Sequence, residues 1–312
     1  MEGTDLKEPG DANEPGDMKD TGDMSEPGDM SEPGDMQTRT RLVDSLQIRY
    51  ADTGARVGPV ILLTSPWPES LLAFRRIWPA LAATGRLVAV DLPGFGHSQG
   101  RTDLFAPDAM AEFLRQLIEE FGLGTPHLVA PDVGTAASLF LAARHPDAVK
   151  TIITGGGAAA YPLDVTGAAA DVIAAPSIEV FQDLDIRAII GATVGPVAPR
   201  AQEPGVWEDY VTSYDHGRFA QSARYVRSYP EQLKVLRDLL PLVRVPVHIV
   251  TGAHDPLLPV SNARYLAGRI PGSKLSILDA GHFFWEQVPG QYAAIIADWV
   301  ARAEPVAPRD AT

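Results

Sequence analysis

The chain has 312 residues, of which 45% are hydrophobic, so it is long and apolar enough to build one large domain with a substantial core. It has no cysteine, which excludes disulfide bonds and thiol nucleophiles, and its seven histidines show no metal-ligand spacing. A phosphate-binding loop and a basic, aromatic-rich stripe are both absent from the sequence, so we expect no nucleic-acid partner, no cofactor and no metal.

Most of the negative charge lies at the start of the chain. Residues 1–36 carry a net charge of −10 out of −14 and repeat a Glu-Pro-Gly-Asp unit. Such a segment cannot bury enough apolar surface to offset its ordering entropy, so we predict a disordered tail, which either only solvates the protein or binds a partner. Residues 305–312 are predicted to form a flexible C-terminus.

The sequence has no signal-peptide pattern at its start and no apolar run of about 18 residues. We therefore expect a soluble, cytoplasmic protein without membrane contact. The sequence does not define an oligomeric state.

Residues 37–160 alternate between short apolar runs and segments of helical periodicity. The continuous apolar runs are typical of strands that are buried on both faces, whereas residues 46–50 alternate and predict an edge strand. This alternation predicts right-handed crossovers and a parallel sheet. Buried strands are predicted at 60–64, 87–91, 128–129 and 149–154, and helices at 72–83, 108–121 and 135–144.

The alternation lapses over residues 161–241, which contain Pro, Gly and short helical pieces at 207–214, 218–229 and 230–240. It resumes over residues 242–304. An insertion of this size between two strands predicts a helical cap over the strand ends, where open parallel sheets bind ligands. The second part has predicted strands at 247–251 and 275–278 and predicted helices at 262–269 and 291–303.

Asp132 stands at the apex of a sharp predicted turn, between the strand that ends at 129 and the helix that starts at 135. A side chain on a strained strand-to-helix turn needs small neighbours, and Ala130, Gly134 and Thr135 provide them. This spacing is the nucleophile-elbow pattern, with Asp in the place of the usual Ser. The alternative is that Asp132 only caps the following helix.

Two more polar residues follow later predicted strands. Asp255 comes just after the strand at 247–251, and His282 comes just after the strand at 275–278. Singly, they could be a turn residue and a surface loop residue. Together with Asp132 they follow the nucleophile, acid, base order of a hydrolase triad, so we predict that the three act together.

Residues 41–303 resemble the α/β-hydrolase superfamily, most closely its branch with an aspartate nucleophile, the epoxide hydrolases and haloalkane dehalogenases. Residues 91–98 (Asp-Leu-Pro-Gly-Phe-Gly-His-Ser) look like that branch's loop after the fourth strand. Residues 65–70 (Ser-Pro-Trp-Pro-Glu-Ser) are similar to the epoxide-hydrolase motif His-Gly-Phe-Pro-Glu-Ser, but have Ser-Pro in place of His-Gly. The resemblance implies an α/β-hydrolase fold: a mostly parallel twisted sheet with helices on both faces and a helical cap between two late strands.

The resemblance also implies a mechanism. Asp132 would displace a leaving group at saturated carbon and form an ester, and His282, oriented by Asp255, would activate water against that ester. The oxyanion donors would be the backbone N–H groups of Trp67 and Val133. The substrate would be a small apolar organic molecule that reacts with water. A Ser-type esterase is disfavoured because the elbow has Asp132 in the place of the usual Ser, and Ser138 lies inside the predicted helical run.

Three functions remain open, and we favour the first. Epoxide opening needs an acid for the alkoxide, which the family takes from cap tyrosines. The cap offers Tyr161, Tyr210, Tyr214, Tyr225 and Tyr229, and the candidate acids are Tyr161, Tyr225 and Tyr229. Haloalkane dehalogenation needs N–H donors for the halide; Trp67 could supply one, but Val133 stands where dehalogenases usually carry Trp and fluoroacetate-type enzymes carry Arg. Many epoxide hydrolases also carry Trp at this position, so Val133 weakens both predictions and leaves the substrate open. The third is a non-catalytic small-ligand binder on the same fold, since function resides in sites rather than folds.

Overall fold

The computed structural model describes residues 36–196, 198 and 203–303. The predicted N-terminal tail, apart from Met36, and the predicted flexible C-terminus lie outside the described residues. Within the described part of the chain, no helix combines the length and the apolar character that a membrane span requires.

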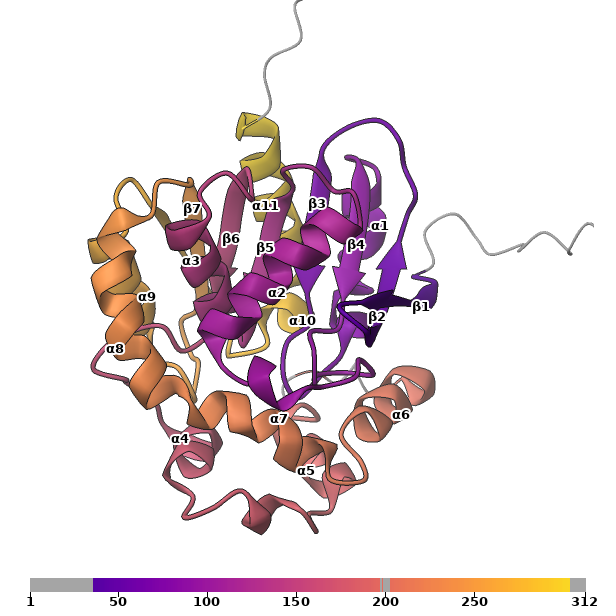
Figure 1. The fold of residues 1–312 in the computed structure, drawn as a ribbon, viewed down its shortest axis with the longest axis vertical. Coiled ribbons are helices and arrows are strands. Elements are labelled where there is room, and N and C mark those ends of the chain that lie inside the picture. Colours follow the sequence, from indigo (N-terminus) through magenta and orange to yellow (C-terminus); the bar gives the residue numbers. More distant parts are fainter. Residues whose placement is uncertain (1–35, 197, 199–202, 304–312) are drawn as a thin grey trace, which may run out of the picture. The chain divides into compact units, whose positions relative to one another are not determined.

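The core is an eight-stranded sheet in the order β1-β2-β4-β3-β5-β6-β7-β8 (Figure 1). Strands β3 to β8 pair in parallel, whereas β2 pairs antiparallel with both β1 and β4. The strands are β1 (Thr38–Val43), β2 (Leu46–Asp52), β3 (Val60–Thr64), β4 (Arg86–Val90), β5 (His127–Pro131), β6 (Thr151–Gly155), β7 (Val247–Gly252) and β8 (Lys274–Leu278).

The prediction that residues 46–50 form an edge strand was wrong. The segment at 46–50 forms most of β2, which lies inside the sheet, and β1 is the edge. In β1 only Val43 is buried, so its sequence carries no apolar signal that could reveal it.

Helices cover both faces of the sheet because successive strand residues point to opposite sides. In β3, Leu62 joins the hydrophobic cluster of α2 (Pro107–Glu120), α3 (Gly134–Arg144) and α9 (Val260–Arg269). Its neighbours Ile61 and Leu63 join the opposite cluster, with α1 (Trp78–Ala82), α10 (Phe284–Gln287) and α11 (Pro289–Ala303). The helix predicted over 72–83 is split into a 3-10 turn, Leu71–Phe74, and α1, whose second residue is Pro79.

The chain between β6 and β7 forms a set of helices, which we call the cap. They lie beyond one end of the sheet, and α8 runs back along α3 (Figure 1). The cap helices are α4 (Gly167–Ala174), η3 (Glu179–Phe181), α5 (Ile186–Thr193), α6 (Pro204–Ser213), α7 (Arg218–Arg227), α8 (Tyr229–Leu239) and η5 (Leu240–Leu242).

Candidate active site

The site lies where the strand order reverses. Strand β3 has β4 on one side and β5 on the other, so the chain leaves the carboxyl ends of β3 and β5 in opposite directions and opens a crevice there. Trp67 follows β3 and Asp132 follows β5. Asp255 follows β7 and His282 follows β8, so the sheet brings all four predicted residues to one edge.

Asp132 occupies a strained turn. Its φ is +51°, in the left-handed region that Asp tolerates better than most residues. The turn is closed by the Asp132 N–H, which donates to the Gly155 carbonyl (3.0 Å), and by the Thr135 N–H, which donates to the Asp132 carbonyl (2.9 Å). A Cβ at Gly157 would lie 1.9 Å from the Asp132 carbonyl oxygen, and one at Gly134 would lie 2.5 Å from Thr64 Oγ1. Small residues are therefore required on both sides of the turn.

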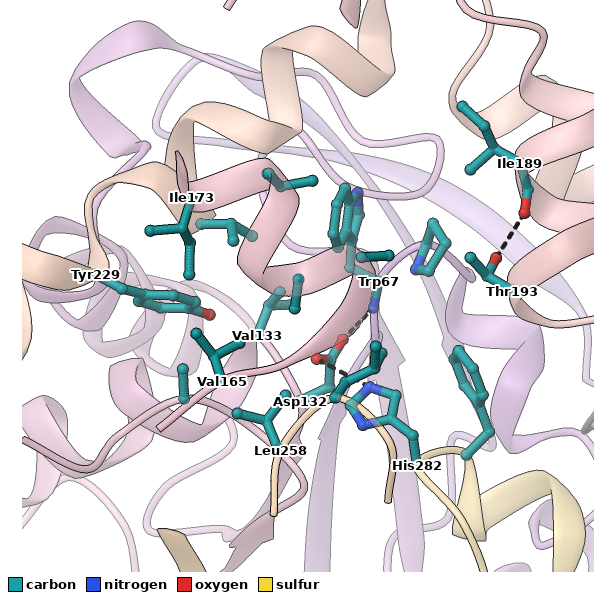
Figure 2. Close-up of a pocket in the computed structure, with 18 of the residues that line it drawn as sticks. Trp67, Asp132, Val133, Val165, Ile173, Ile189, Thr193, Tyr229, Leu258 and His282 are labelled. Carbon is teal, nitrogen blue, oxygen red and sulfur yellow. Dashed lines mark hydrogen bonds and ion pairs between the residues drawn. The ribbon is translucent and has the colours of Figure 1, made fainter. Parts of the chain in front are cut away.

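The Asp132 carboxylate is not a helix cap. The N-cap position of α3 belongs to Val133 and has no side-chain bond. Instead, Asp132 Oδ2 accepts the Trp67 backbone N–H at 2.5 Å, and Oδ1 lies 3.7 Å from His282 Nε2 (Figure 2). The two carboxylate oxygens thus have different surroundings: one is held by a backbone donor, and the other faces the imidazole.

Asp255 fixes the orientation of the imidazole. His282 Nδ1 lies 2.8 Å from Asp255 Oδ2, and Asp255 Oδ1 accepts the N–H groups of Leu257 (2.8 Å) and Leu258 (2.9 Å). With both carboxylate oxygens bonded, Asp255 cannot rotate freely. His282 therefore presents Nε2 to Asp132.

The two aspartates also control the protonation of His282. Burial lowers the pKa of the imidazole, but its interactions with Asp132 and Asp255 outweigh burial and raise the pKa to about 10. The imidazole is therefore protonated at neutral pH and forms an ion pair with Asp132. Loss of the Asp132 charge would lower the pKa of His282.

A small cavity of about 90 Å³ opens in front of Asp132, between the strand ends and the cap (Figure 2). Its charged groups are Asp132 and His282, and its Thr193 hydroxyl is engaged by the Ile189 carbonyl at 2.8 Å. The other lining residues are apolar or aromatic: Trp67, Pro68, Val133, Ala158, Val165, Ala168, Ala169, Val172, Ile173, Ile189, Phe219, Val226, Tyr229, Leu257, Leu258 and Phe283.

The structure separates the three predicted cap tyrosines. The Tyr225 hydroxyl donates to the Val133 carbonyl at 2.9 Å, so Tyr225 supports the turn. Tyr161 stacks beneath the Arg237 guanidinium, 5.1 Å from the ring centre, and is not among the lining residues of the cavity. Tyr229 does line the cavity, and Figure 2 shows its hydroxyl directed toward Val133. Burial raises the pKa of Tyr229 well above its usual value, and the nearby Asp132 carboxylate raises it further, so the hydroxyl keeps its proton.

The Trp67 side chain is already engaged. Its indole N–H donates to Ser222 Oγ of α7 at 2.9 Å, while its backbone N–H binds Asp132. Val133 is 1% exposed and has no side-chain donor. The two positions that could supply halide donors therefore offer no free side-chain N–H to the cavity.

A buried acid near the site was not given a role in the sequence prediction. Glu69, part of the Pro-Glu-Ser motif, accepts the Trp285 indole N–H at 2.6 Å, and the Trp285 ring meets the His282 ring edge-on at 5.9 Å. Burial raises the pKa of Glu69 well above its usual value, and the nearby Glu286 raises it further. Trp285 lies 216 residues away in the chain, so no local pattern could reveal the contact.

Comparisons with known proteins agree with this architecture. A family model described as alpha/beta hydrolase fold matches residues 59–175. An uncharacterized hydrolase of Saccharomyces cerevisiae is 24% identical over 268 residues, 80% of this chain and 91% of that protein. A haloalkane dehalogenase of Mycobacterium marinum is 26% identical over 272 residues, 81% of this chain and 89% of that protein.

Solved structures show the same fold. The crystal structure of Cfl2 from Burkholderia cenocepacia superposes with a TM-score of 0.73 at 24% identity, covering 84% of this chain and 95% of that chain. Epoxide hydrolase VrEH1 from Vigna radiata superposes with a TM-score of 0.67 at 18% identity, covering 87% and 100%. The chain thus has the α/β-hydrolase fold, and the matches support the α/β-hydrolase superfamily and a hydrolase of that type.

Proposed function

We propose that the protein is an epoxide hydrolase-like enzyme that opens a small, uncharged, apolar epoxide by forming an ester with Asp132. The observation that carries this proposal is the inequivalence of the two Asp132 oxygens. Oδ2 is bound to the Trp67 N–H, whereas Oδ1 has no such donor and lies 3.7 Å from His282 Nε2, and Asp132 lines the cavity. A carboxylate needs no deprotonation at neutral pH, so Oδ1 can attack directly.

In the first step, Asp132 Oδ1 attacks one ring carbon of the epoxide, and the bond between that carbon and the ring oxygen breaks. The ring oxygen takes the proton of the Tyr229 hydroxyl, which lines the cavity. An alkoxide is more basic than a phenolate, so this transfer runs downhill even with a raised Tyr229 pKa. The products are a hydroxyalkyl ester and a tyrosinate.

Formation of the ester prepares the second step. Asp132 is now neutral, so one of the two charges that raise the pKa of His282 is gone, and the imidazole can release its proton to the tyrosinate. Neutral His282 then takes a proton from water, and the hydroxide adds to the ester carbon. The negative charge forms on Oδ2, which the Trp67 N–H stabilises.

Collapse of this intermediate breaks the bond between the ester carbon and Oδ1. The diol oxygen leaves with the proton held by His282, and the new carboxylic acid gives its proton back to His282. Water and epoxide have been converted to diol, and Asp132, His282 and Tyr229 are in their starting states.

The cavity supports an uncharged substrate. A carboxylate or ammonium group would have to leave water for a lining whose charged members are Asp132 and His282, and such a transfer is costly without a partner. A volume of about 90 Å³ also favours a compact molecule.

Haloalkane dehalogenation is the second candidate, because the Mycobacterium marinum relative bears that name. The structure offers no free side-chain N–H for a halide at these two positions, because the Trp67 indole is bonded to Ser222 and Val133 is aliphatic. Another relative of similar identity bears the name 2-hydroxymuconate semialdehyde hydrolase, which indicates a different class of substrate. A non-catalytic binder would retain the cavity but form no ester.

The test uses His282→Gln, which keeps the nucleophile and removes the base. The wild type is first offered panels of small epoxides, haloalkanes and esters, with diol and halide detection. His282→Gln is then incubated with the best substrate and analysed by intact-protein mass spectrometry and peptide mapping. The proposal predicts an adduct on Asp132 whose mass equals the whole epoxide.

The outcomes separate the three candidates. An adduct that lacks a halogen indicates a dehalogenase, and no adduct with a bound substrate indicates a binder. His254→Gln is the matched control, because His254 is an exposed histidine that pairs with Asp279. It should turn over substrate like the wild type and accumulate no adduct.

A further inference from the structure

The segment of residues 65–70, which we call the oxyanion loop, is anchored to the core at its ends and at the Glu69 side chain, which accepts the Trp285 indole N–H. The Ser65 N–H donates to the Val90 carbonyl at 2.9 Å, and the Leu71 N–H, just past the loop, donates to Asp91 Oδ1 at 2.7 Å. Between these anchors lies Trp67, whose N–H holds Asp132. The position of this donor therefore depends on what holds the middle of the loop.

Tyr214 of the cap holds the loop at Glu69. This residue follows α6 directly and is fully buried. Its hydroxyl donates to the Glu69 carbonyl at 2.7 Å and accepts the Gly96 N–H at 3.1 Å. One cap hydroxyl thus ties the loop after β3 to the loop after β4.

Asp209 of α6 holds the loop at Ser70. Its Oδ1 accepts the Ser70 hydroxyl at 2.5 Å, and its two oxygens bind the Arg49 guanidinium at 3.1 and 2.6 Å. Burial raises the pKa of Asp209, but bonds from His97, Arg49 and Ser70 outweigh burial and lower the pKa to about 2. The carboxylate is therefore ionised throughout the neutral range and remains a strong acceptor.

A third cap contact reaches Trp67 itself, through the bond from its indole to Ser222 of α7. Within the described residues, cap side chains thus contact the loop at Trp67, Glu69 and Ser70. Docking of the cap and placement of the Trp67 N–H are coupled by these contacts.

We propose that Asp209 and Tyr214 are positioning residues that set the oxyanion donor and make hydrolysis of the ester depend on cap docking. This inference rests on the proposed function. In the mechanism above, Oδ2 is a carboxylate oxygen during ester formation and carries the full charge of the tetrahedral intermediate during hydrolysis. A displaced Trp67 N–H therefore slows the second step more than the first.

The test compares Tyr214→Phe and Asp209→Asn with Thr212→Val. Thr212 also lies on α6, but its hydroxyl bonds only to carbonyls of its own helix, so it is a matched control. For each protein, kcat and kcat/KM are measured, and the fraction of enzyme present as ester is measured by rapid quenching and intact-protein mass spectrometry. Melting curves establish that all comparisons are made on folded protein.

The expected result is a fall in kcat on the order of tenfold for Tyr214→Phe and Asp209→Asn, smaller than the roughly 10²-fold of losing one oxyanion donor outright. Because kcat/KM reports steps up to ester formation, it should stay within about twofold of the wild type. The ester fraction should rise. General damage to the site would lower kcat/KM as well and would not accumulate ester.

Three results overturn the inference. The first is that the wild type forms ester but the two variants keep its kcat. The second is that the variants lose kcat and kcat/KM together without accumulating ester. In both cases the inference is wrong and the proposed function stands. The third is that the wild type forms no ester on Asp132, and then both the inference and the proposed function are wrong. Where Tyr214→Phe does not fold, Ser70→Ala removes the Asp209 contact from the loop side and must show the same split between kcat and kcat/KM.

Discussion

Asp132 Oδ1 lies 3.7 Å from His282 Nε2, with the second carboxylate oxygen withdrawn onto the Trp67 N–H. This distance is that of an ion pair and is too long for a direct hydrogen bond. The pair is thus held together by charge and by the fixed orientation of His282 on Asp255, and both Asp132 and His282 line the cavity.

The strained backbone at Asp132 predicts how substitutions there affect stability. Asp132→Asn should fold and lose all turnover, because an amide is not a nucleophile and Asn tolerates a φ of +51°. Asp132→Gly should be more stable than Asp132→Ala by about 1 kcal/mol, because only Gly adopts this conformation without strain. Urea unfolding of the two variants measures the difference. Equal stability of Gly and Ala at this position would show that the turn is not strained in solution.

The raised pKa of His282 predicts a loss of stability in alkali. In the folded protein His282 titrates at about 10, above its usual value of 6.5, so the folded state binds the proton more tightly. The resulting stabilisation is fully present below pH 6.5 and is lost as the pH rises to about 10. Each pKa unit corresponds to about 1.4 kcal/mol, so the total should reach a few kcal/mol.

The measurement is urea unfolding of the wild type and His282→Gln at several pH values across this window. The free energy of unfolding of the wild type should fall with pH relative to that of the variant. Parallel curves for the two proteins would mean that Asp132 and Asp255 do not raise the pKa of His282.

We predict that halide does not bind at the Trp67 indole. Its N–H is occupied by Ser222, so bromide should quench the tryptophan fluorescence of the wild type only by collision, without saturation. Ser222→Ala frees this donor and should show a saturable component. Ser228→Ala, which removes a hydroxyl bonded to the Tyr225 carbonyl, is the control for a cap serine. Saturable quenching in the wild type would favour a dehalogenase.

Much of the sheet could be predicted because buried parallel strands have continuous apolar runs. Strands β3, β4 and β7 lie within a residue of their predicted bounds. Strand β1 could not be predicted, because it pairs at the edge and exposes nearly all of its side chains. The segment at 72–83 carries helical spacing throughout and was predicted as one helix. In the structure its first turn is a separate 3-10 turn, whose N-cap, Ser70, is also held by Asp209 of the cap.

The order of Asp132, Asp255 and His282 along the chain was sufficient to predict that they meet, because each follows a parallel strand. The choice among the cap tyrosines was not predictable. Whether a hydroxyl faces the cavity, as for Tyr229, or a backbone carbonyl, as for Tyr225, depends on how the cap helices dock on the strand ends, which the periodicity within each helix does not specify. The contact of Asp209 with Arg49 spans 160 residues and likewise leaves no local signal.

The proposed covalent ester on Asp132 is cleaved at its carbonyl carbon, so the two oxygens of the carboxylate have different fates. A single turnover in ¹⁸O-labelled water, with enzyme in excess over the epoxide identified in the screen, follows them. The first diol should carry no label, because its new oxygen comes from Asp132 Oδ1, and peptide mapping should find one ¹⁸O in the Asp132 side chain. A first-turnover diol that carries ¹⁸O, with an unlabelled Asp132, would mean that water attacks the substrate directly and that no ester forms.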